Sequence, residues 1–106
     1  DHRAAGQVVI DAVFPAAGNK AYFPELLAEG LEPHMPKEVW ASLTNRPNVT
    51  MDVTDTWPIK LEALLHHASQ IGDVDKFKAR MASRHTEGST DENPRFEEKF
   101  RVVKYG

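Results

Sequence analysis

The first part of the chain carries apolar residues at every third or fourth position. These residues are Ala5, Val8, Val9, Ala12 and Val13. Because an α-helix completes one turn in about 3.6 residues, this spacing predicts a single apolar helical face between Arg3 and about Phe14. Asp1 precedes the predicted helix, where its carboxylate can cap the first turn, and Pro15 follows it. The pattern therefore predicts a helix whose N-terminal end lies beside His2.

Two short stretches in the middle of the chain have the composition of β-strands. Residues 38–43 combine β-branched and aromatic side chains, and residues 49–53 alternate apolar with polar ones. The Asn-Arg-Pro-Asn stretch at 45–48 has the composition of a turn, and the two strands either form a hairpin or pair with different neighbours. Before them, residues 19–36 are rich in proline, and only residues 23–27 indicate a helical turn.

The second half of the chain predicts two helices and a final strand. Thr54 or Asp55 caps the first of these helices, and Gly72 ends it. The second helix runs from Asp73 to about Ser83, and residues 85–94 form a polar loop. The last segment is predicted to be extended, and its apolar residues are Phe96, Phe100, Val102, Val103 and Tyr105.

The order of these elements indicates the fold class. Helix, strand, strand, helix, helix and strand follow one another, which is typical of part of a layered α/β protein. Too few crossover units are present for a complete doubly wound sheet. No internal repeat and no change in composition divides the 106 residues, so we expect one domain.

Composition and charge exclude several classes of function. With 41% hydrophobic and 27% charged residues, the chain has the composition of a soluble globular protein. Its net charge of −3, with both signs interleaved, provides no basic stripe, so we expect no nucleic-acid partner. No apolar run reaches the roughly 20 residues that span a bilayer, so we expect no membrane partner, and the cytoplasm is the default location. Because cysteine is absent, only histidine and carboxylate side chains can hold a metal.

Histidines are therefore the first side chains to consider for metal chemistry. His66 and His67 are adjacent on a predicted helix, so they point about 100° apart and make a poor chelate for one metal. We expect one of them to be exposed and the other half-buried and hydrogen-bonded. His34 and His85 lie in predicted loops without paired ligands and receive no role.

The two tryptophans offer a possible platform for a sugar ring. Trp40 lies on the first predicted strand, and Trp57 lies at the start of a predicted helix. Large aromatic side chains at such positions usually pack in a core, so we expect both to be buried rather than to bind carbohydrate.

The start of the chain, Asp1-His2-Arg3-Ala4-Ala5-Gly6, resembles the second motif of zinc-dependent de-N-acetylases of the LmbE/PIG-L type, His-Pro-Asp-His-Arg-Ala. Further stretches that look like this family follow in the same order: 22–26, 38–40, 53–55, Lys60, 67–70 and 98–101. The family's first motif, Pro-His-Pro-Asp-Asp-Glu, is absent. The resemblance implies that residues 1–106 are the C-terminal portion of a de-N-acetylase-like domain. It also implies part of a Rossmann-like three-layer fold, with few strands and flanking helices.

The resemblance also implies a set of site residues. In this family a zinc ion is held by a His and an Asp of the first motif and by the position that His2 matches. Asp1 matches a catalytic residue that tunes a neighbouring imidazole, and His67 matches a position that either shapes the pocket wall or fixes a loop. Arg3 either pairs with a carboxylate of the absent motif or is a solvated cation of the first turn. Without the resemblance, Asp1 and His2 would be interpreted as a helix cap and a frayed terminal histidine.

The implied function is the removal of acetyl from an N-acetylglucosamine-type substrate, a small-molecule amino sugar. We expect the chain to be inactive alone, because His2 supplies one ligand where a zinc site needs about three from protein. The alternative is a noncatalytic binding or scaffolding domain that retains the fold, and a hydrolase built on His66 and His67 ranks last. We also expect the first helix to pack on a small sheet with one exposed apolar side, which leaves a homo-oligomer open.

Overall fold

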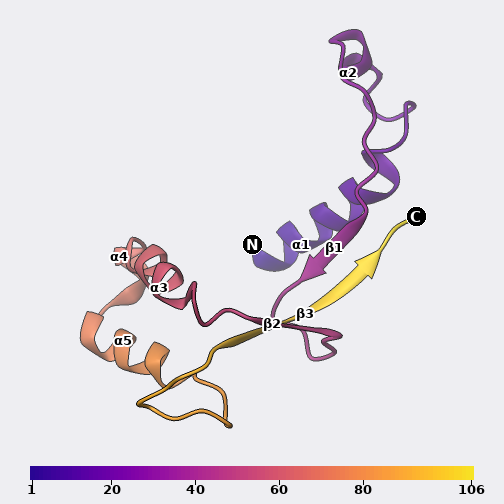
Figure 1. The fold of residues 1–106 in the computed structure, drawn as a ribbon. Helices are drawn as coiled ribbons and strands as arrows, with labels where there is room; N and C mark the ends of the chain where they lie inside the picture. The colour runs from indigo at the N-terminus through magenta and orange to yellow at the C-terminus, as the bar shows by residue number, and fades with distance from the viewer. The chain divides into compact units, whose positions relative to one another are not determined.

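The computed structural model describes all residues from 1 to 106 and divides into two compact units, Asp1–Trp40 with Val103–Gly106, and Ala41–Val102. The elements follow in the order α1 (His2–Asp11), η1 (Ala12–Ala16), α2 (Pro24–Ala28), β1 (Glu38–Ala41), β2 (Val49–Asp52), α3 (Trp57–Leu65), α4 (Ala68–Ile71), α5 (Val74–Ala82) and β3 (Glu97–Lys104) (Figure 1). The strands form one sheet in the order β1-β3-β2. The predicted mixed α/β class with few strands is therefore confirmed.

The predicted first helix is present but ends early. α1 stops at Asp11, and the short π-helical segment η1 continues it. Within η1 the backbone of Phe14 is extended, with φ −152° and ψ 127°. A residue that precedes a proline is driven out of the helical region by the proline ring, so Pro15 accounts for this break. The helical turn expected at residues 23–27 is present as α2, in which Pro24 occupies the first position.

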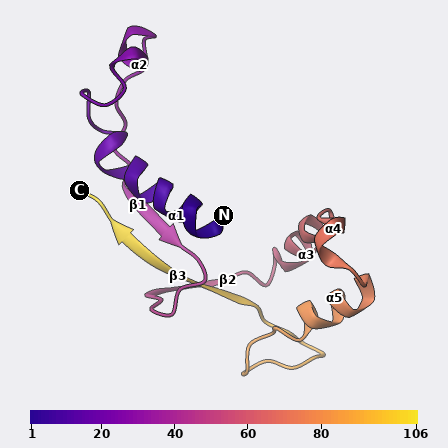
Figure 2. The same cartoon turned by 180° about the vertical axis from the view of Figure 1, so that it is seen from behind.

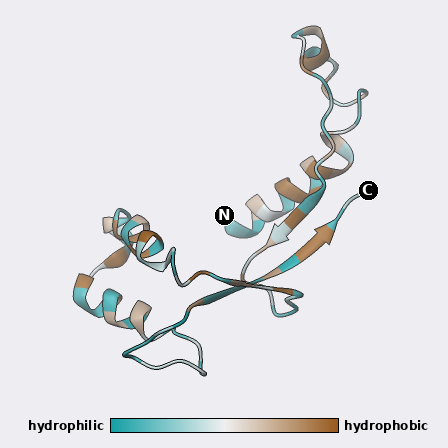
Figure 3. Ribbon diagram, viewed as in Figure 1, coloured by the Kyte–Doolittle hydropathy of each residue, from teal (hydrophilic) through white to brown (hydrophobic).

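The expected packing of the first helix on the sheet is not found. No residue of α1 is buried. The element that α1 contacts most is η1, which directly follows it in the chain. Figure 3 shows the hydrophobic colouring along the later turns of this exposed helix.

β2 and β3 pair in antiparallel orientation, with Val49 opposite Phe100 and Asp52 opposite Glu97. β1 and β2 do not form a hairpin, because β3 lies between them in the sheet. Pairing with different neighbours, one of the two predicted alternatives, is thus confirmed. Along β3, the partly buried Glu98 and Phe100 alternate with exposed residues, as expected for a strand with one solvated face.

The helix predicted between residue 54 or 55 and Gly72 consists of two helices, α3 and α4. The predicted cap is wrong, because the residue that precedes α3 is Thr56, which makes no side-chain capping bond. The hydroxyl of Thr54 has another partner, since it donates to the carboxylate of Asp52 at 2.6 Å. Gly72, with a positive φ of 70°, ends α4 as predicted.

α5 begins at its predicted cap. The carboxylate of Asp73 accepts a hydrogen bond from the backbone N–H of Lys76 at 3.0 Å. This contact satisfies one of the N–H groups that a helix start leaves without a partner. Both views show α3, α4 and α5 side by side (Figures 1 and 2). None of the helices combines the length and apolar content that a membrane-crossing helix requires.

The buried side chains all belong to the second unit and are Trp57, Phe77, Met81 and Phe96. The rings of Trp57 and Phe96 stack with centroids 4.2 Å apart and planes 8° apart. Core packing of Trp57 is therefore confirmed. The same expectation is wrong for Trp40, which is 45% exposed and donates its indole N–H to Glu38 on the same strand, at 2.8 Å.

Candidate functional site

Three of the predicted site residues lie together at the start of α1. Asp1 precedes the helix and its carbonyl oxygen accepts the backbone N–H of Ala5 at 2.8 Å, but its carboxylate makes no capping bond. His2 and Arg3 occupy the first turn, and all three side chains are exposed. The unpaired N–H groups of a helix start favour negative charge, so the position stabilises the carboxylate of Asp1 and slightly disfavours Arg3. This turn therefore presents an acid, an imidazole and a guanidinium to their surroundings.

The fourth predicted site residue, His67, lies in the second unit between α3 and α4. Its backbone, with φ −84° and ψ 56°, leaves the helical conformation and separates the two helices. The Nδ1 atom of its neighbour His66 lies 2.9 Å from the carbonyl oxygen of Glu62. Both histidines are exposed, so the expectation that one is half-buried is wrong. Neither ring belongs to the buried cluster around Trp57.

The residues of this chain do not by themselves form a zinc site. No group of three histidine or carboxylate side chains is placed to hold a metal ion, and no cysteine is present. A stable zinc site takes three or four protein ligands, and α1 offers the imidazole of His2 alone at its exposed turn. A metal at this position would need further ligands from outside the chain.

A hydrogen-bonded histidine that the sequence analysis left without a role lies in the loop after α5. His85 Nδ1 is 3.1 Å from the hydroxyl of Ser89, and its Nε2 is 2.9 Å from the carboxylate of Asp91. The order Asp, His, Ser is that of a nucleophilic triad, but the Ser89 hydroxyl donates to the carbonyl of Thr86 at 2.9 Å. The cluster therefore holds the loop together, and the loop's polar composition was the only signal for it.

The carboxylate of Asp52 at the end of β2 is held in its charged form. It accepts hydrogen bonds from the hydroxyl of Thr54 at 2.6 Å and from the Thr54 backbone N–H at 3.0 Å, and it pairs with Arg95. These contacts, the Thr54 hydroxyl first, lower the pKa of Asp52 from 3.8 to about 2. A group with this pKa carries no proton to donate near neutral pH, so Asp52 stabilises the strand end rather than acting as an acid.

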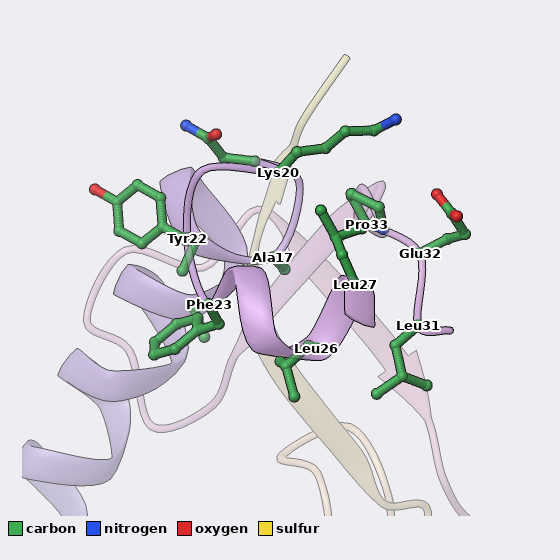
Figure 4. A pocket seen from close by; sticks show the side chains of 12 residues that line it. Ala17, Lys20, Tyr22, Phe23, Leu26, Leu27, Leu31, Glu32 and Pro33 are labelled. Atoms are coloured by element: carbon green, nitrogen blue, oxygen red, sulfur yellow. The ribbon is translucent and has the colours of Figure 1, made fainter. Parts of the chain in front are cut away.

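A pocket of about 210 Å³ lies in the first unit, between η1 and α2 (Figure 4). Its walls are mostly apolar and include Tyr22, Phe23 and Leu26. In Figure 4 the charged ends of Lys20 and Glu32 point away from the helix. Sites that bind small molecules usually combine an apolar wall with a few polar groups that converge on the ligand. This pocket lacks such groups and is not the candidate active site.

Comparison with known proteins gives the chain a partial homologue among deacetylases. Over 70 residues, 66% of the chain, it is 39% identical to diacetylchitobiose deacetylase of Thermococcus kodakarensis. The matched region is 26% of that protein, so the chain spans about a quarter of the length of this curated relative. No protein-family model and no solved structure matches the chain.

Proposed function

We propose that the chain is part of an amide hydrolase of the LmbE/PIG-L de-N-acetylase type. The similarity to diacetylchitobiose deacetylase carries this proposal, because that name states both deacetylation and a substrate that contains acetylated amino sugars. The reaction adds water to the acetamide of an N-acetylglucosamine-type substrate and yields acetate and a free amine. The exposed turn with Asp1, His2 and Arg3 supports the proposal, since it matches the family motif and leaves all three side chains accessible.

We assign His2 the role of one metal ligand and Asp1 that of a positioning residue for a neighbouring imidazole. The zinc ion of the proposal takes its remaining ligands from the part of the enzyme outside this chain, because the chain provides no complete set. A carboxylate that accepts a hydrogen bond from an imidazole ring orients that ring and raises its basicity, which is the role proposed for Asp1. The chain alone should therefore release no acetate.

The test compares two variants of the complete protein that contains this chain. His2→Ala should lower both the bound zinc and the release of acetate from an N-acetylglucosamine derivative. Asp1→Ala should retain the zinc and lower turnover by about 10-fold to 100-fold, the usual cost of losing such a partner. Gln7→Ala, a change on the opposite side of the same helix, serves as the matched control and should alter neither quantity.

Two outcomes would contradict the proposal. Unchanged zinc content in the His2 variant would remove the ligand assignment. A complete, zinc-loaded protein that releases no acetate from any N-acetylated amino sugar would instead favour the noncatalytic binding or scaffolding domain.

A further inference from the structure

A cleft of about 580 Å³ lies within the second unit. Its walls come from the loop after β1, the start of α3, Arg84 in the turn after α5, and the first half of β3. Pockets that bind small molecules have volumes of about 300–1,000 Å³, so this cleft has a suitable size. None of the residues proposed for the zinc site lines it, so a ligand bound there goes beyond the proposed zinc chemistry.

Two of the cations that line the cleft have no partner in the chain. The ammonium group of Lys60 pairs with the carboxylate of Glu98, so these two charges offset each other. Arg84 and Lys99 are exposed, and their side chains form neither a salt bridge nor a hydrogen bond. Two positive charges in the cleft therefore remain available to an anionic ligand.

The other groups of the cleft add a polar acceptor and an apolar wall. The carboxylate of Glu97 has no side-chain partner and only accepts hydrogen bonds, so a ligand beside it must offer donors such as hydroxyl groups. Leu43 contributes to the apolar wall, is 100% exposed and has a positive φ of 54°. A leucine in this left-handed conformation is an outlier, and such outliers gather at ligand clamps.

We propose that this cleft binds a small sugar that carries a phosphate monoester. Such a phosphate has a charge of about −1.5 to −2 near neutral pH, which matches the two free cations Arg84 and Lys99, whereas a carboxylate would leave one of them unpaired. The sugar hydroxyls donate to Glu97, and the apolar face of the sugar ring covers Leu43. A long polyanion fits less well, because the carboxylates of Glu97 and Glu98 line the same cleft.

Calorimetric titration of the 106-residue chain with glucose-6-phosphate tests the proposal, with glucose and inorganic phosphate as the comparison ligands. The phosphorylated sugar should bind at least about tenfold more tightly than either, because only it makes both sets of contacts. Arg84→Gln and Lys99→Gln should each lower its affinity by about tenfold, the usual effect of losing a charge-assisted hydrogen bond. Lys78→Gln is the matched control, since Lys78 is an exposed cation of α5 outside the cleft, and it should retain the affinity.

Each other result overturns the proposal. No binding of any of the three ligands, or equal affinity for glucose and its phosphate ester, means that the cleft is not an anion site. Inorganic phosphate that binds as tightly as the phosphorylated sugar removes the contacts with the sugar. An equal loss of affinity in Lys78→Gln and Arg84→Gln means that the net charge of the surface attracts the ligand. Circular dichroism checks that all variants keep the helical content of the unaltered chain.

Discussion

Replacing Phe96 by Ala should bring the second unit to the edge of unfolding. Phe96 is 6% exposed and its ring stacks on Trp57 at 4.2 Å. Truncation of a buried phenylalanine to alanine costs about 3–5 kcal/mol, and part of this is the aromatic contact, which alone contributes roughly 1 kcal/mol. A unit of roughly 60 residues has a total free energy of unfolding of about 3–9 kcal/mol. The expected loss is therefore comparable with the whole stability of the unit.

The fluorescence of Trp57 during urea unfolding measures this effect. The chain contains two tryptophans, so a Trp40→Phe background leaves Trp57 as the single reporter. Ile59→Ala is the matched control, because Ile59 lies on α3, as Trp57 does, but is 66% exposed. Its truncation should change the free energy of unfolding by less than about 0.5 kcal/mol. If Phe96→Ala and Ile59→Ala shift the urea midpoint equally, the stacked pair is not the centre of the core.

Three further predictions concern single polar side chains. The pKa of Asp52 is lowered from 3.8 to about 2. Its contribution to stability is therefore fully present above its ordinary pKa, and it is lost as the pH falls through about 2. Asp52→Asn should therefore flatten the fall in melting temperature between about pH 4 and pH 2, and an unchanged fall would contradict this. Asp73→Ala removes the cap of α5 and should lower the free energy of unfolding by about 1 kcal/mol. The control Asp75→Ala changes an acidic residue of the first turn that is not the cap, and it should have a smaller effect. His85→Ala should speed proteolytic cleavage within residues 85–94, and equal cleavage of the unaltered chain would show that the histidine does not hold the loop.

Local patterns were sufficient to predict most elements of the fold. The helix at the chain start, the strands near residues 40 and 50, and the capped helix at Asp73 were readable because neighbouring residues alone determine them. The predicted boundaries are wrong where a residue far away in the sequence binds a side chain at the boundary. Thr54 could not cap α3, because Asp52 and the backbone N–H of Phe96, which lies 42 residues away in sequence, bind its hydroxyl.

Burial was harder to predict than secondary structure. Trp40 and Trp57 have similar local signals, but only Trp57 is buried, because α5 and Phe96 supply partners for it. His66 and His67 are predicted by the pattern to lie within one continuous helix, but the helix breaks at His67 and both side chains are exposed. For the two tryptophans the deciding contacts involve residues far away in sequence, which a periodic pattern does not specify.

The same limit applies to the candidate site, where the local pattern identifies residues but not their partners. His2 lies on a ten-residue helix that buries no side chain, and isolated helices of this length are marginal in water. α1 therefore gains little stability from packed side chains of this chain, and its helicity depends on its own residues. A substitution that lowers helicity, such as Val9→Gly, touches no ligand of the proposed zinc site, but it should weaken metal binding in the complete protein by loosening the helix that presents the imidazole. A loss of zinc on substitution in α1 therefore identifies a ligand only when the control Gln7→Ala retains the zinc.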